Sequence, residues 1–141
     1  MNRADVLTAH LPVIDAESEP YWAAARERKF LIRHCEACGR DHFYPRRYCP
    51  HCWSERCVWR PACGRGRIYS YTVIRHNEAP SFRDMVPYIV ALVELDEGVR
   101  VIANIEECTP DVVHVGMAVE VIYQRITDEI TLPQFRPRSP F

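Results

Sequence analysis

The sequence lacks the features that mark several large classes of protein. Its formal net charge is −1 over 141 residues, so it has no basic surplus of the kind that a dedicated nucleic-acid binder usually shows. No stretch approaches the roughly eighteen consecutive apolar residues that a membrane-spanning helix requires. The N-terminal segment MNRADVLTAHLPVIDAESEP contains no apolar core of signal-peptide length. We therefore expect a cytoplasmic protein without a transmembrane segment.

Recognisable catalytic motifs are absent as well. The sequence contains no G-x-S-x-G, P-loop or G-x-G-x-x-G pattern. The nearest approach, Gly64-Arg65-Gly66-Arg67, is too short for a phosphate-binding loop and is better explained as a turn that enters a strand. Cys108 is a single thiol without a marked histidine neighbour in the sequence to activate it. Because no nucleophile, base and orienting residue can be named together, we expect no catalysis by this chain alone.

The pattern of apolar residues indicates a mainly β protein with one short helix. The segment SEPYWAAARERKF suits a helix that has Ser18 as its N-cap and runs to Phe30. After it come the strand-like segments 67–76, 88–95, 99–106, 118–126 and 129–135, with a loop around Pro80 and a turn at Asp96-Glu97-Gly98. A five-stranded Greek-key OB-type barrel is the natural candidate, and an SH3-like barrel is its main competitor.

The composition and these segments also suggest how the chain is organised. Hydrophobic residues make up 48% and charged residues 26% of the chain, as in soluble globular proteins. We expect an N-terminal tail and helix over residues 1–30, a cysteine module over 31–63, and a barrel with a C-terminal tail over 64–141.

Two Cys-x-x-Cys pairs in HCEACGRDHFYPRRYCPHC predict a metal site. Cys35, Cys38, Cys49 and Cys52 supply four thiolates, which is the ligand set of a closed tetrahedral zinc site. Gly39 suits the positive φ that such a turn needs, and residues 39–48 are long enough for a small hairpin. Four protein ligands leave no position open for substrate or water, so we expect one structural zinc ion per chain that holds a short segment folded.

Other uses of these thiols fit less well. The seven cysteines are an odd number, and a reducing compartment disfavours disulfides. A thioredoxin-type redox pair requires a βαβ context that is missing here. Iron in a rubredoxin-like site is chemically reasonable, but nothing else in the sequence suggests electron transfer.

Further cysteines and histidines lie near the predicted site. Cys57 and Cys63 could replace a ligand, but neither belongs to a Cys-x-x-Cys pair, so we expect spare or buried thiols. Four thiolates already complete a tetrahedron, so the nearby histidines are expected to be surface or hydrogen-bonded side chains: His34, His42 and His51.

Arginine and aromatic side chains offer material for binding an anionic ligand. They lie between the two cysteine pairs and at the entrance of the barrel: Phe43, Tyr44, Arg46, Arg47, Tyr48, Arg65 and Arg67. Arginine beside an aromatic surface can hold a phosphate and stack a base, as coenzyme A or single-stranded nucleic acid would need. Alternatively, the tyrosines brace the metal loops and the arginines are hydrated. The helix residues Tyr21 and Trp22 pack either on their own domain or on a partner protein.

The order of these motifs resembles a known family. The motifs are PYWAAARERKFLIRHCEACGRDHFYPRRYCPHCWSE, GRGRIYSYTVIRH, PYIVALVELDEGVRVIANI, VGMAVEVIY and LPQFRP, over about residues 18–137. The chain looks like the bacterial and archaeal family, long catalogued as a domain of unknown function, that joins an N-terminal helix, a rubredoxin-like zinc ribbon and a C-terminal OB-fold. All four ribbon cysteines match, whereas Cys57 and Cys63 are not part of the family pattern.

The resemblance implies a function without catalysis. Members of this family look like companions of thiolase-superfamily enzymes that bind acyl-CoA and support thiolysis, acyl transfer or retro-aldol cleavage by the partner. It implies an accessory subunit that assembles with a thiolase-like protein as two plus two subunits, with a CoA ester as a possible ligand. The alternatives are a zinc-ribbon and OB-fold protein that binds single-stranded nucleic acid, which the near-neutral charge disfavours, and a stand-alone acyl-CoA-binding protein.

Overall fold

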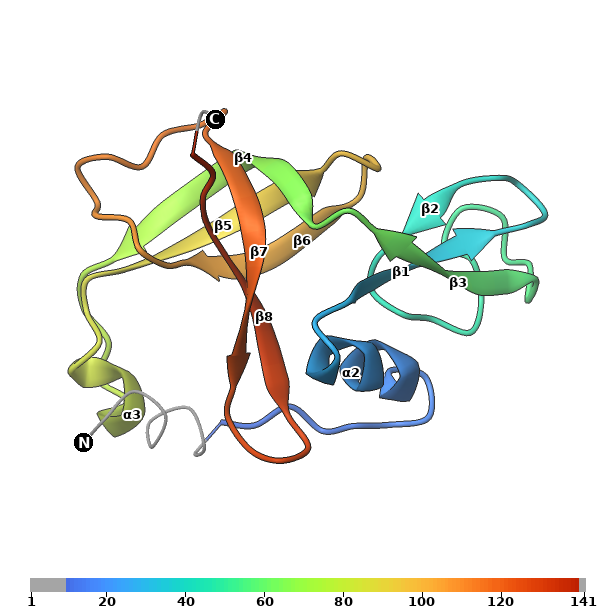
Figure 1. Ribbon diagram of the computed structural model, residues 1–141, viewed down its shortest axis with the longest axis horizontal. Helices are drawn as coiled ribbons and strands as arrows, with labels where there is room; N and C mark the ends of the chain where they lie inside the picture. The colour runs from blue at the N-terminus through green and yellow to red at the C-terminus, as the bar shows by residue number, and fades with distance from the viewer. Residues whose placement is uncertain (1–9, 140–141) are drawn as a thin grey trace.

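A short helix precedes all the strands in the computed structural model, which describes residues 10–139 (Figure 1). Helix α2 spans Glu19–Arg26 and has a proline in its first turn, as expected. Ser18 occupies the N-cap position but makes no side-chain capping bond; its Oγ accepts the backbone N–H of Asp15 instead, at 3.2 Å. The helix ends at Arg26 rather than at Phe30, because Arg28 has a φ of +60° and this left-handed conformation terminates a helix.

The cysteine region forms its own three-stranded antiparallel sheet. Strands β1 (Phe30–Cys35), β2 (Asp41–His42) and β3 (Cys57–Ala62) pair in the order β2-β1-β3. The sequence did not predict β1 or β3, and no residue of β3 is fully buried, so an alternation of buried and exposed residues is missing there. The expected hairpin inside residues 39–48 is wrong, because β2 pairs with β1 and residues 43–48 are irregular.

The second half of the chain forms a closed five-stranded barrel with the order β4-β5-β6-β8-β7. Its strands are β4 (Arg65–Ile74), β5 (Tyr88–Leu95), β6 (Arg100–Ile105), β7 (Ala118–Arg125) and β8 (Thr131–Pro137). The sequence predicted both ends of all five strands to within two residues. The loop expected around Pro80 contains a short helix instead, α3 (Pro80–Arg83). The OB-type barrel expected from the strand pattern is therefore confirmed.

Two glycines allow the start of the barrel to pack closely against neighbouring strands. A Cβ at Gly66 would lie 2.3 Å from the carbonyl oxygen of Glu94 on β5, and one at Gly64 would lie 2.5 Å from Cγ1 of Val121. Neither position has room for a side chain. The Gly-Arg-Gly-Arg segment is thus explained by the approach of β4 to its neighbours, in line with a turn that enters a strand.

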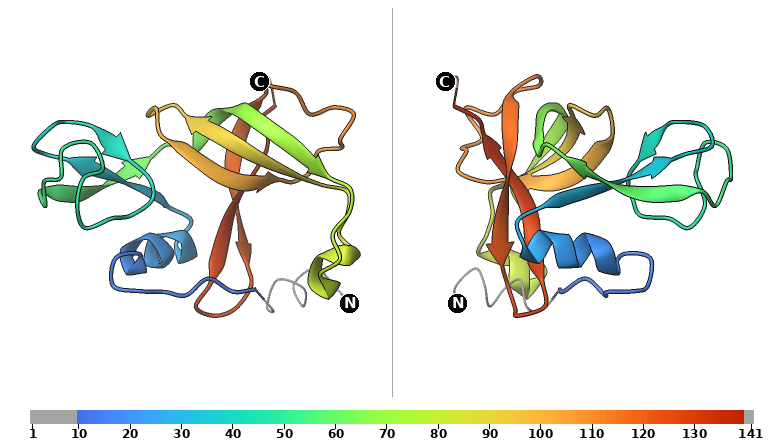
Figure 2. Two further views of the ribbon diagram at one scale, coloured as in Figure 1. Left: turned by 180° about the vertical axis from the view of Figure 1, so that it is seen from behind. Right: turned by 45° about the vertical axis from the view of Figure 1, so that its right-hand side comes forward.

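One hydrophobic core joins the helix, the ribbon and the barrel. Buried side chains from β1 (Phe30 and Ile32) belong to the same cluster as the inward-facing residues of β5 and β6. The ring of Phe30 lies 6.4 Å from that of Phe135 on β8. Figure 2 shows α2 beside β8 and below the ribbon sheet. The aromatic contacts thereby fix the position of the ribbon on the barrel.

The barrel has its least extensive strand pairing between β6 and β8. These two strands are parallel and share a single paired position, Ile105 with Phe135, whereas β7 and β8 pair along seven positions. Residues of helix α2 and the ribbon segment 43–45 line a cavity beside this part of the wall. No helix among residues 10–139 has the length and apolar character needed to cross a membrane.

Candidate metal centre and ligand surfaces

Each Cys-x-x-Cys pair forms a tight turn that a backbone hydrogen bond closes. The N–H of Gly39 donates to the carbonyl of Cys35 at 2.8 Å, and the N–H of Trp53 donates to the carbonyl of Cys49 at 2.8 Å. Gly39 has the predicted positive φ, at +75°, and Trp53 has a φ of +68°. The two turns are therefore equivalent, although a tryptophan takes the place of glycine in the second one.

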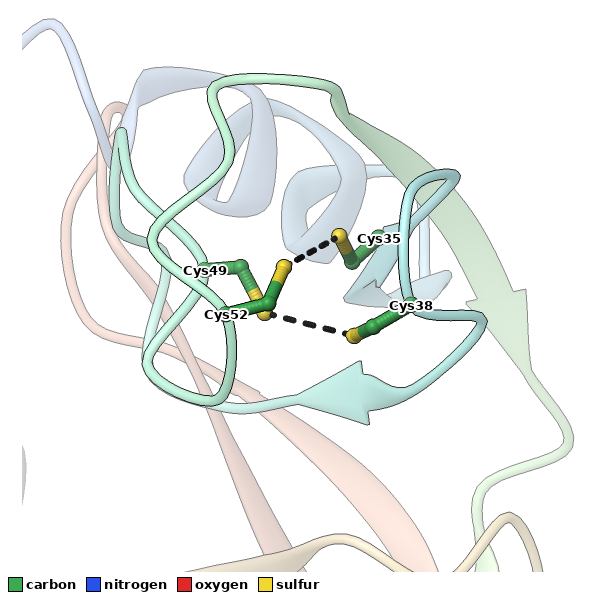
Figure 3. A group of neighbouring side chains, drawn as sticks. All are labelled: Cys35, Cys38, Cys49 and Cys52. Carbon is green, nitrogen blue, oxygen red and sulfur yellow. Dashed lines mark hydrogen bonds between the residues drawn. The ribbon is translucent and has the colours of Figure 1, made fainter.

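The two turns bring four sulfur atoms together, as Figure 3 shows. The Sγ atoms of Cys35, Cys38, Cys49 and Cys52 all lie within 4.8 Å of one another. Cys35 and Cys52 are 3.6 Å apart, and Cys38 and Cys49 are 3.7 Å apart. Thiolates that bind zinc at about 2.3 Å in a tetrahedron are about 3.8 Å from each other, whereas a disulfide requires about 2.05 Å. The geometry of the cluster fits a tetrahedral zinc ion.

The local backbone prepares one of these thiols for metal binding. The backbone N–H of Cys38, with that of Ala37, lowers the pKa of Cys35 to about 6. The backbone N–H of Ser54 acts in the same direction on Cys52, but burial and the adjacent thiols outweigh it and raise the pKa of Cys52 to about 12. Of these two neighbouring sulfurs, Cys35 is therefore the one that more readily forms a thiolate. A bound zinc ion would displace the protons of the remaining thiols, because it binds thiolates.

Cys57 lies beside the cluster without belonging to it. It is directly opposite Cys35 in the β1–β3 ladder, and its thiol lies 3.8 Å from the carbonyl of Ser54, which also accepts the N–H of Cys49. Cys63, by contrast, is exposed rather than buried, and its backbone N–H donates to Glu97 at 2.8 Å. Burial, followed by Asp111, raises the pKa of Cys108, which disfavours a thiolate nucleophile at that position.

The three histidines near the cluster have different surroundings. Nδ1 of His34 lies 2.7 Å from Oδ1 of Asp41, and the ring of His51 is exposed. His42 is buried, and neither of its ring nitrogens hydrogen-bonds to a group among residues 10–139. Burial lowers the pKa of His42, and the positive charge of Arg33, opposite it in the ladder, lowers it further. The neutral ring is therefore the favoured form.

The arginine and aromatic residues singled out in the sequence fall into three separate places. A hollow of about 370 Å³ on the ribbon, which we call the ribbon-tip hollow, is lined by Arg46, Arg47, Tyr48 and Trp53, and by Glu17 from the segment before α2. Phe43 and Tyr44 lie elsewhere, in the wall of an aromatic cavity. Arg65 and Arg67 are on β4, where the guanidinium of Arg67 donates to the carbonyl of Gly116 at 3.0 Å.

The sequence reasoning missed Trp53 as a surface residue. Its side chain is 77% exposed although its backbone is left-handed. It shares the ribbon-tip hollow with Tyr48, which is 45% exposed and has the guanidinium of Arg47 over its ring at 5.6 Å. The equivalence of Trp53 with Gly39 in the two Cys-x-x-Cys turns was the available signal, since a bulky residue rarely takes a left-handed position.

The aromatic cavity lies between helix α2 and the barrel. Its volume is about 320 Å³. It is lined by Tyr21, Trp22, Phe30, Phe43 and Tyr44, together with residues 101–104 of β6 and 132–135 of β8. Tyr21 is 9% exposed, and burial raises its pKa. Most of its ring contacts are with other aromatic residues of the chain, at 5.0 to 5.7 Å. Tyr21 therefore packs on its own chain, whereas Trp22 is partly buried at the edge of the core.

Comparison with known proteins supports both domains. Residues 22–56 match the family described as "ChsH2, rubredoxin-like zinc ribbon domain", and residues 59–124 match "ChsH2, C-terminal OB-fold domain". A "DUF35 domain-containing scaffold protein" of Methanocaldococcus jannaschii is 34% identical over 110 residues, which are 77% of each chain. A solved structure described as "Ltp2-ChsH2(DUF35) aldolase" has a TM-score of 0.79 at 38% identity, covering 90% of this chain and 98% of that one.

Two further relatives are named as enzyme subunits. The "Probable enoyl-CoA hydratase alpha subunit" of Thermomonospora curvata is 39% identical over 92% of this chain, which spans only 40% of the length of that protein. The "Benzoylsuccinyl-CoA thiolase subunit BbsA" of Geobacter metallireducens is 36% identical over 51% of this chain and 47% of its own length. The zinc ribbon and the OB-fold that the sequence resemblance predicted are both confirmed. The chain belongs to the DUF35 family.

Proposed function

We propose that this chain is a non-catalytic accessory subunit of a thiolase-like enzyme that acts on acyl-CoA. The observation that carries the proposal is the similarity over 90% of the chain to the DUF35 chain of an aldolase named for two components. The relative named as a thiolase subunit supports the class of partner. The four-thiol cluster leaves no coordination position for substrate, so a bound metal would hold the ribbon in place while the partner supplies the nucleophile and base.

Co-expression with a thiolase-like protein tests the proposal. We expect a stable complex of two copies of each chain by light scattering, and cleavage or condensation of a CoA ester only when the partner is present. The partner reaction is thiolysis, acyl transfer or retro-aldol cleavage. An enzyme-like rate from the purified chain alone would contradict the proposal. A chain that stays monomeric and binds none of the thiolase-like proteins tested would also contradict it.

Direct contact with the CoA ester is the second part of the proposal. The ribbon-tip hollow combines Arg46 and Arg47, which can bind phosphate, with the rings of Tyr48 and Trp53, which can stack a base. A guanidinium nitrogen of Arg47 lies 3.4 Å from a carboxylate oxygen of Glu55, and both side chains are more than half exposed. Such an exposed pair adds little stability, so the guanidinium can turn to a ligand at little cost.

Calorimetry with coenzyme A on the complex tests this contact. We expect Arg47→Ala and Trp53→Ala each to weaken binding about tenfold or more, and Arg65→Ala, on the barrel, to leave it unchanged. Unchanged affinity in both ribbon variants would exclude the hollow. Equal binding by the chain without its partner would favour a stand-alone acyl-CoA-binding protein. A salt-dependent gel shift with single strands would favour nucleic acid instead.

A further inference from the structure

Strands β5 and β6 carry apolar side chains on both faces of the barrel wall. In β5 the residues at alternate positions from Ile89 to Leu95 are buried in the core. The opposite face of the same two strands carries Val90, Leu92 and Ile102, and the Ile102 side chain is 61% exposed. An antiparallel sheet with one face in water normally alternates apolar and polar residues, whereas strands that are apolar on both faces are covered on both. The centre of this outer face, between Glu94 and Arg100 at one end and Asn104 at the other, therefore has the composition of a covered surface.

The exposed apolar residues lie next to one another on that face. The ladder aligns Ser70, Leu92 and Ile102 in one row across β4, β5 and β6. The next row contains Val90. A hollow of about 270 Å³ on this face is lined by Tyr71 together with Ser70, Val90, Leu92 and Ile102. The adjacent ring of Tyr69 is 50% exposed.

Ile102 connects this face to the aromatic cavity. It lines both the hollow on the barrel face and the cavity beneath helix α2. Tyr44 also lines that cavity and is 51% exposed. The two depressions thus form one apolar surface, which we call the Ile102 surface: Tyr44, Tyr69, Tyr71, Val90, Leu92 and Ile102.

The charges at the rim of this surface satisfy each other. Nε of Arg100 lies 3.0 Å from Oε2 of Glu94, and the same guanidinium lies 3.7 Å from the centre of the Tyr69 ring. An uncharged element could cover the Ile102 surface without leaving either charge unpaired. A charged element would lose hydration with no opposite charge left to compensate it. The charge distribution therefore complements an apolar partner surface.

We propose that the Ile102 surface is the docking site for the thiolase-like subunit, which covers it with an uncharged, apolar element. This inference rests on the proposed function, because it assigns that partner to a specific face. Interfaces concentrate their binding energy in a few aromatic and aliphatic anchors within pockets. Here Ile102 and the open aromatic cavity beside it provide the anchor and the pocket.

A pair of matched variants tests the docking site. Ile102→Glu places a charge in the centre of the surface. Val115→Glu makes the same change in charge at a residue that is 63% exposed but lies in the connection between β6 and β7. Binding to the purified thiolase-like subunit is measured. We expect Ile102→Glu to raise the dissociation constant at least about thirtyfold, as for loss of a hot spot. Val115→Glu should change the dissociation constant less than about threefold. Ile102→Ser, a milder change, should give an intermediate loss.

The readouts separate the two proposals. Zinc content and melting temperature of each variant, measured without the partner, show whether the fold is intact; if Ile102→Glu fails this check, Ile102→Ser decides. Wild-type protein that binds no thiolase-like subunit contradicts the proposed function itself. Wild-type binding that Ile102→Glu or Ile102→Ser leaves unchanged overturns only the docking site. A wild-type chain that dimerises alone and becomes monomeric in Ile102→Glu would show a second copy as the occupant and would also overturn it.

Discussion

Gly39 and Trp53 occupy the same position in the two turns of the metal centre, and both have a left-handed backbone. Their φ angles are +75° and +68°, and each N–H closes its turn at 2.8 Å. Glycine adopts this conformation freely, whereas a residue with a side chain is strained there. The second turn therefore keeps an exposed indole at a position that glycine would fill with less strain, as expected for a residue that contacts a ligand.

This relationship predicts different responses of stability to substitution at the two positions. Gly39→Ala should lower the free energy of unfolding by about 1 kcal/mol, the cost of a side chain in the left-handed region, because no atom within 4 Å would clash. Trp53→Gly should change it by less than about 1 kcal/mol, since relief of strain offsets the greater entropy of the unfolded chain. Denaturant titration at fixed free zinc measures both. A larger loss in Trp53→Gly would mean that the indole stabilises the fold.

Removal of a metal ligand should unfold the ribbon. Cys38→Ser leaves three thiolates, so we expect loss of the zinc ion, loss of the β1–β2 pairing and loss of partner binding. Cys57→Ser is the matched control, because Cys57 lies beside the cluster but outside it. Elemental analysis should find one zinc ion per chain in the wild type and in Cys57→Ser. Iron in the wild type, or a Cys38→Ser protein that keeps metal and partner, would contradict this account.

Zinc affinity should fall as the pH falls, because the ion binds only thiolates. In the metal-free protein Cys52, with a pKa of about 12, carries a proton at pH 7, whereas Cys35, with a pKa of about 6, has mostly lost its own. Binding then releases at least one proton above pH 6 and at least two below it. For each proton that binding releases, the apparent affinity for zinc falls about tenfold when the pH is lowered by one unit. Competition with a chromogenic chelator between pH 8 and pH 5 should show the slope steepen near pH 6, and a constant slope would contradict it.

The barrel could be predicted from the sequence because its strands carry their own signal. Strands β5 and β6 are runs rich in β-branched and other apolar residues on either side of the turn at Asp96-Glu97-Gly98, and such bounded runs are typical of the strands of a hairpin. The ribbon strands lack that signal. Every residue of β3 is exposed or half-buried, and Pro61 interrupts its six-residue run. Ligand spacing therefore located the metal site, while the strands around it were missed.

The surfaces were harder to predict because they depend on contacts between distant segments. The aromatic cavity brings Tyr21 and Trp22 together with Phe43 and Tyr44 and with strands β6 and β8. No local pattern relates these segments. The sequence had assigned the first pair to a partner or to the chain's own core and the second pair to a ligand, yet all four line one cavity. Ile102 stands out only once the ladder shows which face of β6 it occupies.

Substitution of Gly66 should destabilise the barrel. Gly66→Ala would place a methyl group 2.3 Å from the carbonyl oxygen of Glu94, so β4 must move away from β5 and weaken their hydrogen bonds. Overpacking of this kind costs about 1 to 3 kcal/mol. Gly116→Ala is a useful comparison, since it places a side chain at a φ of +88° but meets no atom within 4 Å. Thermal unfolding of both variants should show the larger drop in melting temperature for Gly66→Ala, and equal drops would contradict a steric origin.

Phe30 should be the most sensitive residue at the junction of ribbon and barrel. It is 3% exposed and lies within 5.7 to 6.4 Å of the rings of Tyr21, Phe43 and Phe135, which come from the helix, the ribbon and the barrel. Phe30→Ala would leave a cavity where these three parts meet, and such truncations cost about 3 to 5 kcal/mol. Tyr44→Ala removes an aromatic ring from the edge of the same cluster, where it is 51% exposed, so it should cost less than about 1.5 kcal/mol. Urea unfolding at saturating zinc separates the two. If Phe30→Ala unfolds no more readily than Tyr44→Ala, the ribbon is not held to the barrel through its aromatic core.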